Sequence, residues 1–303
     1  MTLKREAILT EALPYIQEFH NSIMVIKIGG HAIIDPEIMD KIMQNIVLLR
    51  FVGICPILVH GGGPEITEKM NQLGKKPKFI SGLRITDDET LEITRMVLVG
   101  NINTKLVSLI GKHGGKGVGL SGKDGKMITA IKKPTQKVLI DDVEHEMDLG
   151  WVGDTKSINP DIIHILIDKG YIPVISPIAM DKDGNSMNIN ADTVASSIAI
   201  SLKAKKLILM TDVPGVLKEQ GNIETRISQI AVNEVDELIK NLIITGGMIP
   251  KIQSAAKAVS NNVEKAHIID GSASHSILLE LFTDIGIGTM VYDSHRVIIE
   301  PNE

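Results

Sequence analysis

Short apolar runs alternate with amphipathic segments along most of the chain. Continuous apolar runs of strand length predict buried strands at residues 23–28, 57–60, 171–175 and 207–210. A segment with apolar residues at helical spacing, residues 36–51, separates the first two runs. Strands that alternate with helices are typical of βαβ units, so the pattern predicts an α/β fold with a mainly parallel sheet. The sequence has no low-complexity linker, so we expect its two halves to share one sheet or a broad interface.

Three glycines follow the second predicted strand, in the stretch His60-Gly61-Gly62-Gly63-Pro64. Pro64 suits the first turn of a helix, where its missing N–H is not needed. The glycines have no Cβ atoms to shield their backbone N–H groups, and a helix N-terminus is electropositive. The stretch is therefore typical of a phosphate or carboxylate site. By itself it is explained equally well as a turn selected for its shape.

Two lysines accompany pairs of glycines in a similar way. Lys27 lies near the end of the first predicted strand, just before a glycine pair. Because ligands bind parallel sheets at the carboxyl ends of the strands, Lys27 and the three glycines fall at the same edge. Gly246 and Gly247 precede a predicted helix that carries Lys251, which repeats the pattern of an anion site. A solvated strand-end lysine and a flexible glycine loop are the alternative interpretations.

A predicted loop adds a candidate contact for an anionic ligand, and a near-match to a known phosphate-binding motif can be rejected. Residues 81–86 are predicted to form a loop that leads into a helix at residues 87–99. Arg84 in that loop is placed to bind a carboxylate bidentately, although a surface charge is equally consistent. Residues 117–123 match the P-loop pattern GxxxxGK, but Asp124 replaces the required Ser or Thr and no helix is predicted to follow. We therefore reject a P-loop.

The composition is that of a soluble globular protein. The chain has 303 residues, 43% of them hydrophobic and 23% charged, enough to bury a substantial core. A net charge of −5 and an aromatic content of 3% argue against general nucleic-acid binding. The single cysteine excludes an internal disulfide and a cysteine-rich zinc site. No apolar run approaches the roughly 18 residues of a membrane span. We expect a cytoplasmic protein with neither a nucleic-acid nor a membrane partner.

Six motifs in a fixed order resemble those of the amino-acid kinase superfamily across nearly the whole chain. Within it, they are most similar to the branch that phosphorylates N-acetyl-L-glutamate. The motifs are Val25-Ile26-Lys27-Ile28-Gly29-Gly30, His60-Gly61-Gly62-Gly63-Pro64, Ser81-Gly82-Leu83-Arg84-Ile85-Thr86, residues 118–125, Asn188-Ile189-Asn190-Ala191-Asp192 and Gly246-Gly247-Met248-Ile249-Pro250-Lys251. Each motif alone is a weak signal, and the ordered set is a strong one.

The resemblance implies a three-layer αβα sandwich with an open, mainly parallel central sheet and two lobes. Residues 1–20 would form a helical extension for oligomerisation and regulation. Residues 21–195 would bind N-acetyl-L-glutamate, and residues 196–303 would bind ATP and contain an arginine site. The implied reaction transfers the γ-phosphoryl group of MgATP to the side-chain carboxylate of N-acetyl-L-glutamate, a step of arginine biosynthesis.

The resemblance also implies a role for each matching residue. Lys27 and Lys251 would stabilise the transferring phosphoryl group, and Asp192 would orient both lysines. The substrate would contact Gly62, Gly63, Arg84 and Asn188. The nucleotide would contact Gly29, Gly30, Thr211, Asp212, Gly246, Gly247 and Met248. Mg²⁺ would arrive with ATP, since the sequence shows no dedicated carboxylate cluster for a metal. One departure is Ile28, where longer family members often have tyrosine.

The ends of the chain are similar to the arginine-inhibited, hexameric branch of the family. The similarity covers residues 1–20 and residues 275–289. It implies that arginine is an inhibitor, that Glu280 and Gly286 belong to its site, and that the chain forms a homo-hexamer built as a trimer of dimers. A PII-type signalling protein is a further partner that the resemblance allows. A solvated carboxylate on an amphipathic helix is the alternative interpretation of Glu280.

Other functions stay open at this point. The nearest is a kinase of the same superfamily that acts on aspartate, glutamate, carbamate or UMP, although Gly82-Leu83-Arg84 and residues 188–192 favour N-acetyl-L-glutamate. A nicotinamide-dependent oxidoreductase would need GxGxxG after the first strand, and Lys27-Ile28-Gly29-Gly30 does not match that pattern. A catalytically silent arginine sensor would not need to retain Lys27, Asp192 and Lys251.

Overall fold

The computed structural model describes residues 11–80, 82–140, 143–283 and 286–296. Within these residues, eight strands form the central sheet in the order β14-β16-β15-β13-β1-β2-β10-β5. Every neighbouring pair is parallel except β15 and β16. The prediction of an open, mainly parallel sheet is confirmed. The strands are β1 (Ile23–Ile28), β2 (Cys55–His60), β5 (Gly117–Ser121), β10 (Ile172–Ser176), β13 (Lys206–Thr211), β14 (Gln229–Ala231), β15 (Lys265–Asp270) and β16 (Thr289–Tyr292).

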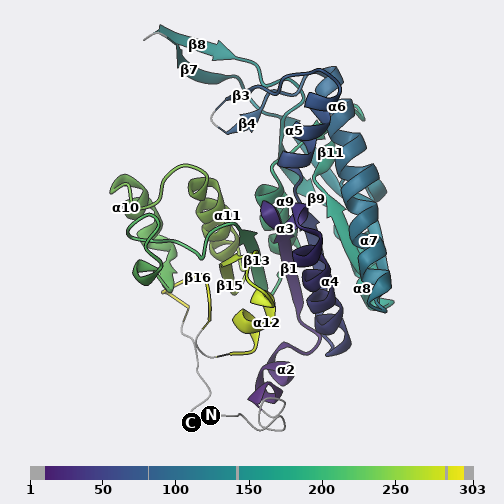
Figure 1. Ribbon diagram of the computed structural model, residues 1–303, viewed down its shortest axis with the longest axis vertical. Coiled ribbons are helices and arrows are strands. Elements are labelled where there is room, and N and C mark those ends of the chain that lie inside the picture. Colours follow the sequence, from purple (N-terminus) through teal and green to yellow (C-terminus); the bar gives the residue numbers. More distant parts are fainter. Residues whose placement is uncertain (1–10, 81, 141–142, 284–285, 297–303) are drawn as a thin grey trace.

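Helices cover both faces of this sheet, which makes three layers (Figure 1). Side chains alternate along the strands, so Val25 of β1 joins the core on one face while Met24 and Ile26 join the core on the other. The first face is covered by α8 (Asp161–Asp168), α9 (Ala191–Ser201), α10 (Val235–Lys240) and α11 (Met248–Ser260). The second is covered by α3 (His31–Ile34), α4 (Pro36–Phe51), α5 (Gly63–Gln72), α6 (Asp88–Arg95), α7 (Asn103–Lys112) and α12 (Ser276–Leu281). The predicted αβα sandwich is confirmed.

Smaller sheets lie beyond the strand ends of the first half of the chain (Figure 1). One has the order β12-β11-β6-β9, and two are hairpins, β3 with β4 and β7 with β8. Their strands are β3 (Phe79–Ile80), β4 (Leu83–Arg84), β6 (Ile128–Lys132), β7 (Gln136–Ile140), β8 (Val143–Met147), β9 (Gly153–Ile158), β11 (Ile178–Met180) and β12 (Ser186–Asn188). Short 3₁₀ turns are η2 (Asp124–Lys126), η3 (Ile223–Thr225) and η4 (Val232–Glu234).

The predicted loop at residues 81–86 is wrong in one respect, because Arg84 lies on strand β4. Arg84 pairs with Phe79 of β3 in an antiparallel hairpin. Gly82 has a φ of +79°, a conformation that favours glycine and allows the tight turn. The structure therefore places Arg84 on a short hairpin strand.

The helix predicted at residues 87–99 is longer than expected. Helix α6 runs into the π-helical segment η1 (Met96–Ile102), which runs into α7 without a break. Gly100 lies inside η1, where Val97, Leu98 and Ile102 are buried in the second core. Tertiary packing of these apolar side chains outweighs the low helix propensity of one glycine.

The first described helix, α2 (Leu13–Phe19), packs against its own chain. Pro14 lies in its first turn, as expected for a helix start, while residues 1–10 of the predicted extension lie outside the described residues. Phe19 is buried in the second core. The ammonium groups of Lys205 and Lys206 lie 5.5 and 5.1 Å from the centre of its ring. Helix α2 is thus held by both apolar and cation–π contacts.

The two halves of the chain meet in the middle of the central sheet. Strand β1 pairs with β13 from Met24↔Lys206 to Lys27↔Leu209, so the shared sheet predicted from the missing linker is confirmed. The predicted division at residues 195 and 196 falls within helix α9. No helix in the described part of the chain has the length and apolar character needed to cross a membrane.

Candidate active site

Two glycine loops begin side by side at the carboxyl ends of neighbouring strands. Ile28 of β1 pairs with His60 of β2, so the loops that follow these strands start at the same level. The N–H of Gly61 donates to the carbonyl oxygen of Ile28 over 2.9 Å, which ties the two strand ends together. The predicted edge for ligand binding is therefore built from adjacent backbone segments.

A single carboxylate bridges two lysines that are 224 residues apart in the sequence, at positions 27 and 251. Asp192 Oδ1 lies 2.9 Å from Lys27 Nζ, and Asp192 Oδ2 lies 2.9 Å from Lys251 Nζ. Lys27 comes from β1, Lys251 from the first turns of α11 and Asp192 from the first turn of α9. The structure therefore brings together the three residues that the sequence predicted as catalytic.

The Lys27–Asp192 part of this bridge is buried, and the bridge carries a surplus positive charge. Lys27 is 6% and Asp192 4% exposed. Burial lowers the pKa of Lys27, and the nearby Asp192 carboxylate opposes that shift. Burial alone would raise the pKa of Asp192, but the two ammonium groups outweigh it and hold that pKa below its usual range. Asp192 is therefore ionised at neutral pH, and it leaves one cation of the pair uncompensated.

Asn190 fixes the start of the helix that carries Asp192. Its side-chain oxygen accepts from the N–H groups of Asp192 and Thr193 over 2.8 and 3.1 Å, so it is the N-cap of α9. Asn190 belongs to the motif Asn188-Ile189-Asn190-Ala191-Asp192, and its capping role is not evident from that motif. An Asn followed two residues later by an acidic residue at a helix start is the signal that could have identified it.

A small cavity of about 170 Å³ lies beside the bridge and contains all four predicted substrate contacts. These are Gly62, Gly63, Arg84 and Asn188. An added Cβ atom at Gly63 would meet no atom within 4 Å, so this first residue of α5 opens onto free space. The cavity thus combines an accessible helix N-terminus with a guanidinium group.

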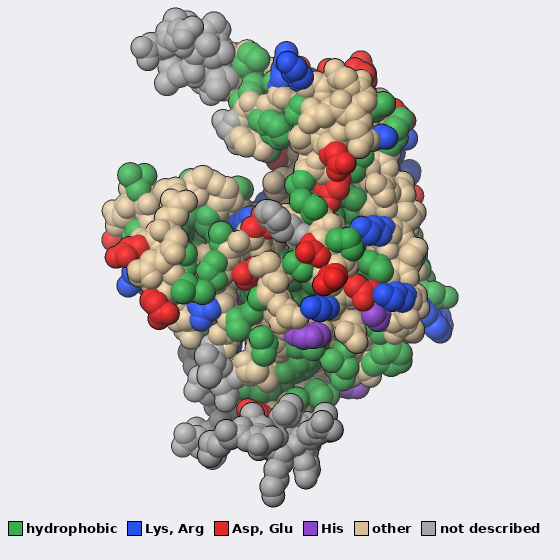
Figure 2. Space-filling view, viewed as in Figure 1, with side chains coloured by type: hydrophobic (Ala, Val, Ile, Leu, Met, Phe, Trp, Pro, Cys, Tyr) green, Lys and Arg blue, Asp and Glu red, His purple; other side chains and the backbone are tan. Residues whose placement is uncertain are grey.

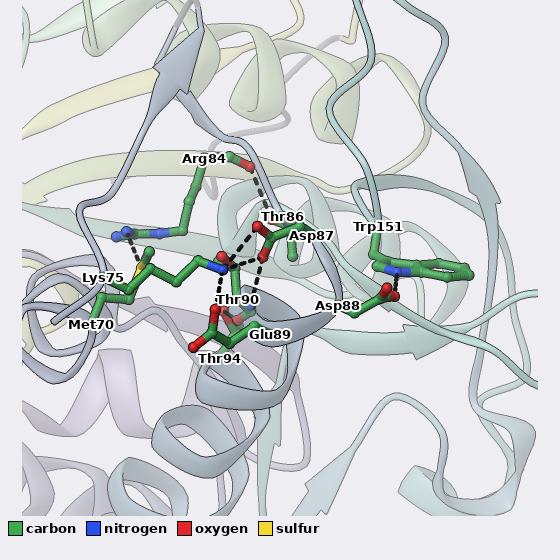
Figure 3. Close-up of polar contacts among 10 residues, drawn as sticks. All are labelled: Met70, Lys75, Arg84, Thr86, Asp87, Asp88, Glu89, Thr90, Thr94 and Trp151. Carbon is green, nitrogen blue, oxygen red and sulfur yellow. Dashed lines mark hydrogen bonds and ion pairs between the residues drawn. The ribbon is translucent and has the colours of Figure 1, made fainter. Parts of the chain in front are cut away.

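Arg84 is a buried cation held by neutral groups. Its Nη2 atom donates to Gly63 O and to Thr67 Oγ1, each over 2.8 Å, and its Nη1 atom lies 3.2 Å from the sulfur of Met70. Figure 3 shows the side chain reaching toward Met70. Burial lowers the pKa of this guanidinium from its very high ordinary value. Among the described residues it has no carboxylate partner, so an anionic ligand would supply the missing countercharge.

A polar network anchors the hairpin that carries Arg84 (Figure 3). Thr86 Oγ1 donates to Arg84 O over 2.9 Å, and Asn188 Nδ2 donates weakly to Thr86 Oγ1 over 3.4 Å. The Trp151 backbone N–H donates to Thr86 O, and its indole N–H donates to Asp88 over 2.6 Å. Thr86 and Trp151 were not identified from the sequence, because their partners are distant along the chain.

A larger cleft of about 1020 Å³ adjoins the small cavity, and Asn190 lines both. Figure 2 shows the molecule hollowed between the part that contains α10 and α11 and the part that contains β3 and β4. Gly246 and Gly247 line the cleft just before α11, and Lys251 of α11 also lines it. A Cβ atom added at either glycine would meet no atom within 4 Å. Lys133, Asp154, Ser196 and Lys257 also line it and were not predicted.

The remaining predicted nucleotide contacts lie around the ends of β1, β13 and α11. An added Cβ at Gly29 would overlap the folded-back side chain of Lys27. Gly30 has a φ of +63° and lies against the Asp212 carboxylate. Thr211 ends β13, and Met248 packs against the first core. Gly30 is thus favoured by the local backbone geometry, whatever it binds.

Glu280, predicted for an arginine site, is buried at the opposite end of the sheet strands. It accepts from His267 Nδ1 over 2.6 Å and from the N–H groups of Ile287 and Gly288. His267 Nε2 in turn lies 3.1 Å from Lys206 Nζ, at the start of β13. The Glu280 side chain is 5% exposed, so the alternative of a solvated carboxylate is wrong. Gly286 has a φ of +54° and lies beside the carboxylate.

The described residues contain no group of three or more His, Cys, Asp or Glu side chains that could hold a metal ion. Both oxygens of Asp192, the only carboxylate of the lysine bridge, already face ammonium groups. Among the described residues, this region thus offers no cluster of carboxylates for a metal ion.

The chain belongs to the amino acid kinase family, whose sequence profile matches residues 22–270. It is 70% identical over 292 residues to the acetylglutamate kinase of Methanococcoides burtonii, with 96% of each chain covered. It is 63% identical to the acetylglutamate kinase of Methanosarcina acetivorans, over 96% of this chain and 98% of that one. The solved N-acetylglutamate synthase from Neisseria gonorrhoeae, complexed with coenzyme A and N-acetyl-glutamate, superposes with a TM-score of 0.82 and 25% identity. The match covers 97% of this chain and 65% of the synthase.

These comparisons confirm the family and the branch that the six motifs indicated. The alternative function of a nicotinamide-dependent oxidoreductase is wrong, because the matched family is one of kinases. The roles of the individual site residues stay predictions.

Proposed function

We propose that the chain catalyses ATP-dependent phosphorylation of the side-chain carboxylate of N-acetyl-L-glutamate, giving N-acetyl-L-glutamyl 5-phosphate in arginine biosynthesis. The observation that carries the proposal is the Lys27–Asp192–Lys251 bridge beside a cavity with a guanidinium that has no carboxylate partner among the described residues. A site of this kind suits two anions that must react with each other. The acetylglutamate kinases at 70% and 63% identity support N-acetylglutamate as the acceptor.

The reaction needs charge neutralisation and alignment more than acid–base chemistry. The acceptor carboxylate is already deprotonated, so its oxygen attacks the γ-phosphorus directly and no general base is required. The new O–P bond forms as the bond between the γ-phosphorus and the β,γ-bridging oxygen breaks, and ADP leaves with that electron pair. Lys27 and Lys251 neutralise the phosphoryl oxygens from opposite sides, and Asp192 keeps both ammonium groups charged and aimed.

Each half of the chain supplies one ligand site in this proposal. Residues 21–195 bind N-acetyl-L-glutamate: Arg84 binds its α-carboxylate, Asn188 its acetamido group, and Gly62 and Gly63 the reacting end. Residues 196–303 supply most of the ATP site, which includes the larger cleft where Gly246 and Gly247 line it and extends to the carboxyl ends of β1 and β13. The nucleotide contacts are Gly29, Gly30, Thr211, Asp212, Gly246, Gly247 and Met248. Mg²⁺ supplies further charge neutralisation and is carried by the ATP phosphates.

A coupled ADP-release assay tests the function and the role of Arg84 together. We expect turnover with N-acetyl-L-glutamate and little with glutamate, aspartate, carbamate or UMP. Replacing Arg84 with methionine should raise the KM for N-acetyl-L-glutamate about 10- to 100-fold, because a charged hydrogen bond contributes about 1.5–3 kcal/mol. The KM for ATP should change by less than about threefold.

Exposed Arg95, replaced by methionine, is the matched control, because its partner Glu92 lies on the surface. Turnover of another acceptor without turnover of N-acetyl-L-glutamate would refute the function. An unchanged KM for N-acetyl-L-glutamate in Arg84→Met would show that Arg84 does not bind this substrate.

We also propose feedback inhibition by arginine, in a homo-hexamer that is a trimer of dimers, with a PII-type signalling protein as a further partner. Glu280 and Gly286 form part of the arginine site in this proposal. The support is a buried carboxylate whose neighbours His267 and Lys206 connect it to Phe19 of helix α2. A ligand guanidinium that replaces these contacts would therefore act on the N-terminal helix.

Arginine titrations of the assay test this regulation. We expect arginine to inhibit the parent enzyme, and Glu280→Gln to raise the half-inhibiting concentration at least about tenfold, since a charge-assisted contact is lost. The exposed variant Glu237→Gln should leave that concentration unchanged. Equal arginine sensitivity in Glu280→Gln and the parent refutes the site, and a light-scattering mass other than that of a hexamer refutes the assembly.

A further inference from the structure

A buried polar pair lies directly beneath the glycine loop. His60, the last residue of β2, is 0% exposed, and Asn103, the first residue of α7, is 4% exposed. Asn103 Nδ2 lies 3.2 Å from His60 Nε2, and His60 Nδ1 lies 2.9 Å from the carbonyl oxygen of Gly61. Polar side chains this deep in a core are held by specific hydrogen bonds, and here those bonds end on the loop.

The surroundings of Asn103 determine which of its amide atoms faces His60. The same Nδ2 atom lies 2.9 Å from Val174 O and 3.4 Å from Leu120 O. Both of these are backbone carbonyls that can only accept, so the amide nitrogen must face them and the amide oxygen must point away. Asn103 therefore donates to His60 Nε2, which carries no proton.

The proton of the neutral imidazole is consequently on Nδ1, where it is donated to Gly61 O. The surroundings favour the neutral ring, because burial lowers the pKa of His60 to about 4 and only the Gly61 carbonyl opposes this shift. Lys27 is one register position away on β1, but side-chain alternation places it on the other face of the sheet. His60 is thus neutral, with one tautomer selected by Asn103.

This hydrogen bond sets the orientation of a peptide group in the active site. The peptide between Gly61 and Gly62 is planar and trans, so its carbonyl and its N–H point in opposite directions. Since His60 holds the carbonyl toward the core, the N–H of Gly62 faces the opposite side, where both glycines line the small cavity. A donor fixed in this way is suited to a developing anion.

The π-helical segment η1 packs against the same glycine loop. An added Cβ at Gly62 would meet Leu98 Cδ2 at 2.7 Å and would overlap Ile102 Cδ1, and both side chains belong to η1. Asn103 follows Ile102 directly, so one element supplies both the apolar floor and the polar anchor. A π-helical turn changes the angular position of the residues after it, which is why such turns often accompany functional sites.

We propose that His60 and Asn103 are positioning residues that aim the Gly62 N–H at the transferring phosphoryl group by fixing the Gly61 carbonyl. This inference rests on the proposed function. Neither residue touches a substrate in this arrangement. Both act through the backbone of the glycine loop, so their loss should reduce kcat while the KM for ATP stays nearly constant.

Two substitutions at His60 separate positioning from packing. Asparagine places an amide nitrogen near the position of Nδ1 and can still donate to Gly61 O, whereas leucine fills the space without a donor. We expect His60→Leu to lower kcat about 10- to 100-fold, since losing one such donor outright costs about 10²–10³-fold. His60→Asn should recover activity to within about fivefold of the parent, and exposed His164→Asn is the control. Equal loss in both His60 variants overturns the proposal.

Asn103→Leu provides an independent test of the same contact. Without Asn103 the ring is free to adopt the other tautomer, which turns a lone pair toward Gly61 O. We therefore expect kcat to fall about tenfold, while the KM for ATP stays within about twofold of the parent. The loss should be the same at pH 8 and pH 6, because burial keeps the pKa of His60 at about 4. Exposed Asn71→Leu is the control. An unchanged kcat, or a KM for ATP that rises as much as kcat falls, overturns the proposal.

A measurement without substrate separates this inference from the proposed function. Spectra of ¹⁵N-histidine-labelled protein, with the His60 signals assigned by their absence in His60→Asn, should show a protonated Nδ1 and an unprotonated Nε2. The opposite tautomer overturns the inference even if N-acetyl-L-glutamate is turned over. Conversely, a parent enzyme with the expected tautomer and no turnover of N-acetyl-L-glutamate refutes the function alone.

Discussion

Replacing Lys27 or Lys251 with methionine should lower kcat about 10²–10³-fold, or roughly 3–4 kcal/mol of transition-state stabilisation. Methionine keeps most of the length and the apolar stem of lysine and removes its charge. Each ammonium group is oriented by one oxygen of Asp192 at 2.9 Å. The KM for ATP should rise only a few-fold, because the lost contacts matter most when charge moves onto the β-phosphate.

Steady-state kinetics with both substrates varied will check this result. Lys240→Met, at the exposed end of α10, is the matched control and should match the parent. A kcat within threefold of the parent in either site variant would remove that lysine from the proposed mechanism. Circular dichroism and thermal unfolding of each variant will show whether a loss of activity reflects a loss of folded protein.

Asp192→Asn should lower kcat about 10²-fold at pH 8 and destabilise the fold by about 3–5 kcal/mol. Asparagine keeps the shape of aspartate, yet the variant leaves two ammonium groups close together without a countercharge. Lys27 then experiences burial and the charge of Lys251, both of which lower its pKa, without the opposing carboxylate. The exposed control Asp168→Asn, at the end of α8, should change neither quantity.

The pH dependence of this variant has opposite signs for activity and stability. Lys27 releases its proton at a lower pH than in the parent, so the activity should recover toward pH 6. In the unfolded chain a lysine has a pKa of about 10.4, well above the lowered pKa of Lys27 in the folded variant. Between these two pKa values the unfolded state therefore binds more protons than the folded state. The free energy of unfolding should therefore rise with pH. Parallel pH profiles for the variant and the parent would contradict this account.

The main elements of the fold could be predicted because they depend on local patterns. Strand β1 matches residues 23–28 and helix α4 matches residues 36–51 as predicted, since both are long apolar or amphipathic segments with clear boundaries. The shared sheet also followed from the absence of a linker. The family motifs then brought Lys27, Asp192 and Lys251 together, which hydrophobic periodicity alone could not do.

The parts that could not be predicted depend on contacts between distant residues. Nothing around Gly100 indicates a π-helical turn, because it forms where Leu98 and Ile102 pack beneath Gly62. Asn103 looks like an ordinary helix residue until the backbones of β5 and β10 are beside it. Glu280 similarly fits an exposed amphipathic pattern, and only the fold places His267 against it.

The pairing of β1 with β13 has a consequence for how such an enzyme can be divided. A cut between the two halves would expose two long sheet edges, each with unpaired backbone groups and an apolar core on either side. Neither fragment would keep the reacting groups, because Lys27 belongs to one and Lys251 to the other. The two halves are therefore expected to fold and function only as one unit.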